Sequence, residues 1–472
     1  MPWERARARA LVAVTAAVVA AIPMIGSSPV AANAAVGGAA TRADGSAAKQ
    51  CALPGADGAA SAAPEHEHLD PAAVRQAIDY ASTHLRTSVQ IFRNNCRVGA
   101  GPLDPVTEQA PWNVWSSTKS VVSMLTGIAA DRHQLELDDP IGKYLPRGPE
   151  WGDAAHRAIT IRQLLTETSG LQEAILSEAA TTGTDPNVAQ EALAQPLTHR
   201  PGTHFEYSQR TPDLLAYVVQ RAVDTDLQAF AQHALFDPIG IPHSSYFWLR
   251  DRSGNSYGYA HLFIPPDQFA KLGLLMQNNG AWNDHQVISP GYMHQVAQPT
   301  TTNGCYGQLF WTNAGKPCTG ANIPNAQTVD RRAIPSAPRD SYAMVGAFHQ
   351  NNFVIPSLNM TVTWTGALGD TAPNLQGIAS AQPADLYYNF FRILMRGVKD
   401  HHIPDPGPYT PPPLDLDINP LNYADPRVLL HDLAPNPQCN LLVCNDTIPL
   451  QGTAQNGQAI SRNLLNTLSA GQ

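Results

Sequence analysis

The chain has 472 residues, of which 43% are hydrophobic and 15% charged, and its formal net charge is −9 at pH 7. This length allows one large two-part domain or two ordinary domains. The acidic balance disfavours nucleic acid and anionic membrane surfaces as partners.

The first 34 residues have the features of a secretory signal peptide. Three arginines within the first nine residues precede an apolar stretch over residues 10–26, and Ala32-Asn33-Ala34 matches an A-x-A cleavage site. Pro23 and the shortness of the apolar stretch argue against a membrane anchor, and no other stretch is long and apolar enough to span a bilayer. We predict a secreted protein whose signal peptide is removed near Ala34.

Residues 35–65 are mostly Ala, Gly and Ser, so we predict a flexible leader over residues 35–70. The chain has six cysteines, an even number that suits complete pairing in an oxidising compartment. Because neither a C-x-x-C spacing nor a Cys/His cluster occurs, we predict no zinc site, and we expect no metal or cofactor. Guided by separation along the chain, we predict three disulfides: Cys51–Cys96, Cys305–Cys318 and Cys439–Cys444.

A helical pattern from Pro71 to Leu85 and an alternating strand over residues 88–92 open the folded part of the chain. The next helix is expected to bury one face, because apolar residues recur at i, i+3, i+4 and i+7, namely Val121, Met124, Leu125 and Ile128. Ser116 and Lys119 stand three residues apart at its start and therefore project from the same face. A buried Lys can have its pKa lowered enough to take the proton of a Ser hydroxyl, or it can hold a second base ionised.

Further helices and strands follow in an order that indicates the fold class. We predict helices over residues 137–146, behind an N-capping Asp, 159–170, where Gly170 ends the helix, 212–223, 267–277 and 386–394. We predict strands at residues 342–348, 352–355 and 360–365. Because strands lie at both ends of the domain with helices between them, we predict an α+β fold: an antiparallel sheet flanked by helices, with an inserted all-helical region.

Several motifs occur in an order that is typical of one superfamily. Ser116-Ser117-Thr118-Lys119 has the form S-x-x-K. The accompanying stretches are Leu137–Pro140, Leu164–Leu171, Arg200–Ser208, Asn279–Asn283 and Tyr306–Trp311. Together they resemble the serine β-lactamase and penicillin-binding protein superfamily, in particular its class C-like branch of esterases, D-amino-acid peptidases and nylon-oligomer hydrolases. The resemblance covers roughly residues 75–398 and implies a sheet with flanking helices, an all-helical lobe and an active site between them.

Two motifs depart from the pattern of this superfamily. The second motif, usually Y-x-N, reads Tyr207-Ser208-Gln209, which keeps the phenol and lengthens the amide side chain that would contact substrate. The third motif, usually K/H-T/S-G, falls on Met344-Val345-Gly346-Ala347, in a register anchored by Gln350 and Ile355-Pro356. Met344 then takes the place of a cationic or imidazole residue. The nearby His349 either substitutes for that residue in part or is a structural histidine.

The resemblance implies acyl transfer. Ser116 would attack a carbonyl carbon, and Lys119 and Tyr207 would share the removal of its proton, with either of them as the formal base. The oxyanion would be bound by the backbone N–H groups of Ser116 and Ala347. Four residues are expected to bind the substrate: Gln209, Met344, Gly346 and His349.

Three functions stay open for the domain, which we place at residues 71–400. The leading one is a secreted serine hydrolase that cleaves an ester or amide of a small-molecule or short peptide-like substrate. The second is a cell-wall D-alanyl peptidase or a β-lactamase with the same mechanism. The third is a non-catalytic member that only binds or assembles, against which the intact Ser116, Lys119 and Tyr207 argue.

Residues 401–472 lie beyond the resemblance. Their first half is rich in Pro, which predicts an extended segment. This C-terminal extension would act as a spacer, as a cover on the catalytic domain or as a partner-binding arm. The oligomeric state is left open.

Overall fold

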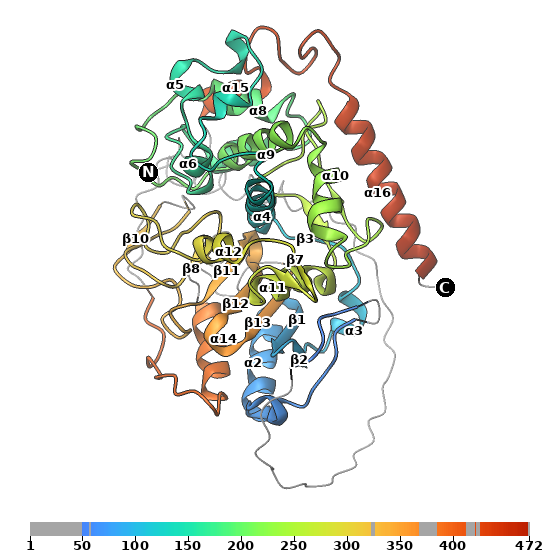
Figure 1. The fold of residues 1–472 in the computed structure, drawn as a ribbon, viewed down its shortest axis with the longest axis vertical. Helices are drawn as coiled ribbons and strands as arrows, with labels where there is room; N and C mark the ends of the chain where they lie inside the picture. The colour runs from blue at the N-terminus through green and yellow to red at the C-terminus, as the bar shows by residue number, and fades with distance from the viewer. Residues whose placement is uncertain are drawn as a thin grey trace, which may run out of the picture. The chain divides into compact units, whose positions relative to one another are not determined.

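The computed structural model describes residues 50–55, 58–321, 326–367, 385–411, 421 and 425–470 (Figure 1). Residues Ala48–Gln472 form one compact unit. The predicted signal peptide and the first part of the predicted leader lie outside the described residues. No helix in the described part of the chain is both long enough and apolar enough to cross a membrane.

The central element of the fold is a six-stranded antiparallel sheet with the strand order β2-β1-β13-β12-β11-β8. Its strands are β1 (Arg86–Arg93), β2 (Cys96–Ala100), β8 (Trp311–Thr312), β11 (Tyr342–Gly346), β12 (Gln350–Ile355) and β13 (Met360–Gly366). Because β1 pairs with β13, strands from the two ends of the domain are neighbours. This arrangement confirms the predicted antiparallel sheet.

Helices cover both faces of the sheet. They include α2 (Pro71–Thr83), α14 (Asp385–Arg396) and α11 (Pro266–Gln277). On β12, Asn351 Nδ2 donates to the hydroxyl of Tyr387 in α14, while Asn352 Nδ2 donates to the carbonyl of Phe269 in α11. Successive side chains of a strand point to opposite faces, so α14 and α11 lie on opposite faces of the sheet. The helix α2 packs against α14.

The helix α4 (Ser117–Asp131) joins this sheet to the all-helical lobe. It packs against β11 and against α9 (Arg210–Val223), and residues 117–129 are all buried. The predicted helix is therefore present, but it is enclosed on every side. The other helices of the lobe are α5 (Ala154–Arg157), α6 (Ile161–Leu165), α7 (Ile175–Ala180), α8 (Val188–Ala194) and α10 (Leu227–Ala231), with a π-helical turn at Gln232–Phe236.

A small sheet of order β3-β5-β4 lies next to the start of α4. Its strands are β3 (Trp112–Asn113), β4 (Phe247–Trp248) and β5 (Leu262–Ile264). The remaining regular elements are α3 (Asp104–Thr107), β6 (Ala281–Trp282), β7 (His285–Gln286), α12 (Pro290–Val296), β9 (Cys318–Thr319) and β10 (Thr328–Val329). Short 3₁₀ helices occur at Pro64–Glu67, Ile141–Lys143, Pro149–Trp151, Ala347–His349 and Pro356–Leu358.

Two predicted helices are shorter in the structure. The helix expected over residues 137–146 is a single 3₁₀ turn, and its N-cap residue, Pro140, has no side-chain acceptor. The helix expected to end at Gly170 is α6, which ends at Leu165. Glu167 has a φ of 52°, a left-handed conformation that is incompatible with a continuing right-handed helix.

Two segments expected to be flexible or extended are packed on the domain where the structure describes them. The Ala62 N–H donates to the Arg97 carbonyl, and the Arg97 N–H donates to the Ala60 carbonyl, so the end of the predicted leader is bound to β2. In the C-terminal extension, α15 (Pro426–Leu433) packs on α7 and α8, and α16 (Gln451–Ala470) packs on β4. The prediction of flexibility is wrong for the bound end of the leader, and the prediction of an extended chain is wrong at α15, which lies in the Pro-rich first half of the extension, because tertiary contacts order both. No conformation was predicted for the residues of α16.

The three predicted disulfides are confirmed. Cys51–Cys96, Cys305–Cys318 and Cys439–Cys444 are bonded across separations of 45, 13 and 5 residues, and no cysteine is free. The first of them adds a covalent link between the predicted leader and β2.

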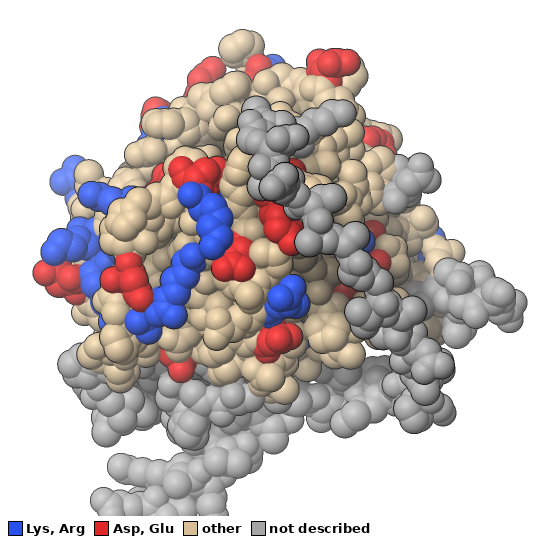
Figure 2. Space-filling model, turned by 90° about the horizontal axis from the view of Figure 1, so that it is seen from below, with Lys and Arg blue, Asp and Glu red and all other residues tan. Residues whose placement is uncertain are grey.

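Charged side chains alternate in sign on the face of the molecule shown in Figure 2. Lys and Arg side chains lie beside Asp and Glu side chains there and do not form a patch of one sign. Asp405 of the C-terminal extension forms ion pairs with Arg392 and Arg396 of α14. These pairs are exposed or half-exposed, so each contributes little to stability.

Candidate active site

Ser116 lies at the N-terminus of α4, directly after a strained turn. Trp115 has a φ of 47°, a left-handed conformation that non-glycine residues rarely adopt and that costs about 1–3 kcal/mol. Asn113 Oδ1 accepts a hydrogen bond from the Trp115 N–H at 2.9 Å, and the Trp115 ring packs on the rings of His261 and Phe348. These contacts hold Ser116 at the N-terminal end of α4, directly before its first residue, Ser117.

Lys119 lies one turn further along α4 and is fully buried. Its Nζ is 3.3 Å from Ser116 Oγ, 2.6 Å from Gln209 Oε1 and 3.5 Å from the carbonyl oxygen of Tyr259. Burial lowers the pKa of its amino group from 10.5 to about 8, although nearby carboxylates act in the opposite direction. At pH 7 roughly a tenth of the molecules therefore carry a neutral amine that can accept a proton.

Tyr207 forms a hydrogen bond with the same Ser116 hydroxyl, and Lys119 Nζ lies 4.3 Å from the centre of the Tyr207 ring. Burial raises the pKa of the phenol above its usual value, and the hydrogen bond to Ser116 offsets this only in part. The rings of Tyr306 and Trp311 pack around it. A phenol with a raised pKa stays protonated at neutral pH, so Tyr207 is suited to donate a proton and Lys119 to accept one.

Gln209 brings the second motif into contact with Lys119. It is the N-cap residue of α9, and its backbone N–H donates to Glu178 Oε2 at 3.0 Å. Its side-chain oxygen accepts the hydrogen bond from Lys119 Nζ. The longer side chain that replaces the usual Asn therefore still reaches the Lys, while its contact with substrate stays a prediction.

The strand β11 runs directly beside the turn that carries Ser116. A Cβ added at Gly346 would collide with the carbonyl oxygen of Val114 and would also crowd the Trp115 side chain. Only glycine permits this approach of one backbone to another. The contact brings the end of β11, where Ala347 follows, to the start of α4.

Two residues expected to bind substrate are enclosed in the fold. Met344 is fully buried, and its Sδ lies 4.0 Å from Nδ2 of Asn352, which points to the face of the sheet that carries α11. His349 is also fully buried, and its Nδ1 lies 2.7 Å from the hydroxyl of Tyr387 in α14. The structure therefore places both side chains in packing contacts instead of at an exposed surface, and His349 has the environment of a structural histidine.

Sequence reasoning missed Glu167, a buried carboxyl close to Lys119. Its exposed fraction is 1%, its Oε2 accepts a hydrogen bond from Ser208 Oγ at 3.3 Å, and its Oε1 has no hydrogen-bond partner among the described residues. Burial raises the pKa of Glu167, and the charge of Lys119 acts in the opposite direction. The only signal in the sequence is an acidic residue inside the otherwise neutral motif Leu164–Leu171. In the described part of the chain, no group of three or more His, Cys, Asp or Glu residues is arranged to hold a metal ion.

Comparison with known proteins identifies the family. The family described as Beta-lactamase matches residues 86–365, which is more than half of the chain. The chain therefore belongs to the β-lactamase family, and this membership supports a role as a hydrolase. The matched region includes Ser116, Lys119, Tyr207 and β11, and it ends before α14 and the C-terminal extension.

Individual relatives are distant. A stretch of 145 residues is 28% identical to Protein flp of Staphylococcus aureus strain N315; it covers 30% of this chain and 29% of that protein, so less than a third of the relative is matched. Among solved structures, a putative β-lactamase from Bacteroides dorei DSM 17855 is 15% identical, with a TM-score of 0.53 over 70% of this chain and 99% of that one. A putative 6-aminohexanoate-dimer hydrolase from Bacillus anthracis is 14% identical, with a TM-score of 0.54 over 73% and 88% of the two chains. At these identities the likeness establishes the fold alone.

Proposed function

We propose that the protein is a secreted serine hydrolase that forms an acyl-enzyme on Ser116 and cleaves an ester or an amide, with the preference of an esterase. One observation carries the proposal. A buried amino group with a lowered pKa, that of Lys119, lies 3.3 Å from the Ser116 hydroxyl, which is also hydrogen-bonded to the phenol of Tyr207. A proton acceptor and a proton donor therefore meet at one nucleophile.

In the proposed acylation step, Ser116 Oγ attacks the carbonyl carbon while Lys119 Nζ takes its proton. The oxyanion forms hydrogen bonds with the backbone N–H groups of Ser116 and Ala347, a role supported by the close approach of β11 to the start of α4. Tyr207 gives its proton to the departing alcohol or amine, the bond between carbonyl and leaving group breaks, and the proton on Lys119 restores the phenol. Deacylation by water follows the same route in reverse.

The substrate class follows from the missing cation of the third motif. Penicillins, cephalosporins and D-alanyl peptides carry a carboxylate close to the bond that is cleaved. In the predicted register of the third motif, Met344 replaces the Lys or His that would pair with that carboxylate, and its enclosed thioether supplies no positive charge to the site. Because burying an unpaired carboxylate costs several kcal/mol, we infer that the site prefers esters or amides with a neutral or apolar acyl part.

A panel of substrates tests this preference. We expect the kcat/KM for the best short-chain p-nitrophenyl ester to exceed that for a chromogenic cephalosporin and for a D-alanyl-D-alanine amide by about 100-fold or more, which corresponds to about 2.7 kcal/mol. Steady-state kinetics at one pH and ionic strength provide the comparison. A cephalosporin whose kcat/KM matches that of the best ester would favour the β-lactamase alternative, and no turnover of any substrate would favour the binding-only alternative.

Two substitutions at Gln209 test whether Lys119 is the base. In Gln209→Met the ammonium loses its 2.6 Å acceptor, so its charged form is less stable and its pKa falls. In Gln209→Glu a carboxylate faces the ammonium, so its pKa rises. We expect the acidic limb of the pH profile of kcat/KM to move to lower pH in the first variant and to higher pH in the second. Shifts of the same sign in both variants would argue against Lys119 as the base.

The extracellular location rests on separate support. Three disulfides and no free thiol suit an oxidising compartment. We infer that the chain is exported and that the predicted signal peptide directs the export.

A further inference from the structure

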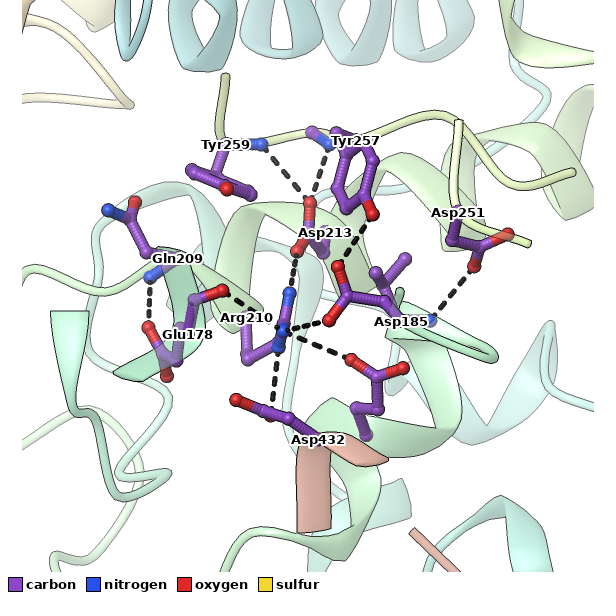
Figure 3. A network of polar contacts seen from close by, with 12 residues as sticks. Glu178, Asp185, Gln209, Arg210, Asp213, Asp251, Tyr257, Tyr259 and Asp432 are labelled. Carbon is purple, nitrogen blue, oxygen red and sulfur yellow. Dashed lines mark hydrogen bonds and ion pairs between the residues drawn. The ribbon is translucent and has the colours of Figure 1, made fainter. Parts of the chain in front are cut away.

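A single arginine lies at the centre of a buried cluster of carboxylates. Arg210 is the first residue of α9, next to Gln209, and its exposed fraction is 1%. Its guanidinium forms ion pairs with four carboxylates, at 2.9 Å with Asp185, 3.1 Å with Glu191, 2.9 Å with Asp213 and 3.2 Å with Asp432 (Figure 3). A buried guanidinium requires such partners, because it has left the water that would otherwise solvate it.

One of these four carboxylates comes from the C-terminal extension. Asp432 lies on α15, well beyond the region 86–365 that matches the family, and its side chain is fully buried. Figure 3 shows α15 entering the cluster from the side opposite Asp213. The helix also contacts the lobe through Asp425, which accepts a hydrogen bond from Gln172 Nε2 at 2.9 Å. The extension therefore supplies part of the interior of the lobe.

The cluster continues from Arg210 to the acceptors that hold Lys119. Asp213 accepts hydrogen bonds from the backbone N–H groups of Gly258 at 2.6 Å and Tyr259 at 3.2 Å, and the Tyr259 carbonyl accepts from Lys119. On the other side, the Gln209 N–H donates to Glu178, and the Gln209 side chain accepts from Lys119. The Tyr259 acceptor is thus held through Asp213 of the cluster, and the Gln209 acceptor, which directly precedes Arg210 in the chain, is held through Glu178.

We propose that Asp432 is a positioning residue for Lys119, and that α15 of the C-terminal extension is therefore an integral part of the active-site structure. This inference rests on the proposed function, because it takes Lys119 as the base that activates Ser116. Of the three roles open to the C-terminal extension, this inference favours that of a cover on the catalytic domain. In this role the extension also influences the pKa of Lys119.

The sign of the effect follows from the charges of the cluster. One guanidinium faces four carboxylates, and burial raises the pKa of Asp213 to about 7 and that of Glu178 to about 8, so protons are shared among them at neutral pH. The Asp432 charge adds to the raised pKa of Glu178. Without Asp432, Glu178 loses its proton more readily, and its negative charge raises the pKa of Lys119. Removing the Asp432 carboxylate thus favours the charged form of Glu178, which raises the pKa of Lys119.

Other ionisable groups also face the two ends of this network. Around Lys119 they are Glu167, Tyr207, Tyr259 and His261. Around Arg210 and Asp432 they are Asp251, Tyr257 and His431. All of them are unchanged in an Asp432 variant, so a shift measured there reports on the Asp432 carboxylate.

The experiment is the pH dependence of fluorophosphonate labelling of the full chain. We expect Asp432→Asn to move the acidic limb of the labelling rate to higher pH by about half a unit, so that labelling at pH 7 slows about threefold while the plateau at high pH is retained. A merely structural role would lower the plateau and leave the limb in place. Asp405→Asn is the matched control, because Asp405 belongs to the same extension and pairs with Arg392 and Arg396 of α14.

Asp425→Asn is the second variant, to be used if Asp432→Asn does not fold. It leaves the Asp432 carboxylate in the chain but weakens the N-cap of α15 and its contact with Gln172, and we expect a smaller shift of the limb in the same direction. A limb at the wild-type pH in both variants, or an equal shift in Asp405→Asn, would overturn the inference and leave the proposed function intact. A wild-type protein that is not labelled at Ser116 would overturn both.

Discussion

Replacing Ser116 with Ala should abolish labelling by a fluorophosphonate and lower ester turnover by about 10⁴-fold or more, because the attacking oxygen is lost. Thermal unfolding should change little. Ser116 is the N-cap residue of α4, but its side chain makes no capping hydrogen bond, so the substitution removes no cap from the helix. Mass spectrometry of the labelled protein and the midpoint of thermal unfolding measure the two effects.

The adjacent serine provides the control. Ser117 is fully buried, and its Oγ donates to the carbonyl of Gln350 at 2.9 Å. Ser117→Ala should therefore lower the free energy of unfolding by about 1 kcal/mol and leave labelling in place. Labelling that persists in Ser116→Ala, or that disappears in Ser117→Ala alone, would contradict the assignment of the nucleophile.

Replacing Lys119 with Met should lower the rate of labelling and of ester turnover by about 10³-fold or more, because Ser116 then lacks its proton acceptor. The substitution also changes how the free energy of unfolding depends on pH. The pKa of Lys119 falls from 10.5 to about 8 on folding, so the unfolded chain binds more protons between these two values and the wild-type protein gains stability as the pH rises through that window. Relative to Lys119→Met, the free energy of unfolding of the wild type should rise by about 3 kcal/mol between pH 7 and pH 11.

Lys271 is the matched control for this experiment. It is a second buried lysine, on α11, and its Nζ donates to the carbonyl of Gly240. Lys271→Met should leave the labelling rate within a few-fold of the wild type, because no hydrogen bond or ion pair joins Lys271 to Ser116 in the described part of the chain. Chemical denaturation over a series of pH values measures the stability difference. A difference that stays constant between pH 7 and pH 11 would show that Lys119 is not desolvated as the structure indicates.

The central elements of the fold could be predicted from local patterns in the amino-acid sequence. The i, i+3, i+4, i+7 spacing of α4 and the apolar runs of β11, β12 and β13 are local patterns, and for these elements the local pattern was enough to predict helix or strand. The disulfides were also predicted correctly, because each joins cysteines that are neighbours in the order of the chain. The proximity of Ser116 and Lys119 could be predicted for the same reason, because side chains three residues apart on a helix are neighbours.

The environment of Ser116 and Lys119 could not be predicted in this way, because it is made by tertiary contacts. The groups that set the pKa of Lys119 and hold its ammonium come from distant parts of the chain, among them Glu167, Gln209 and Tyr259. The enclosure of Met344 and the docking of Asp432 on Arg210 are likewise products of long-range packing. Periodicity in a sequence indicates which face of a helix or strand is apolar, but it does not indicate which elements pack together. Desolvation and charge pairing depend on that packing.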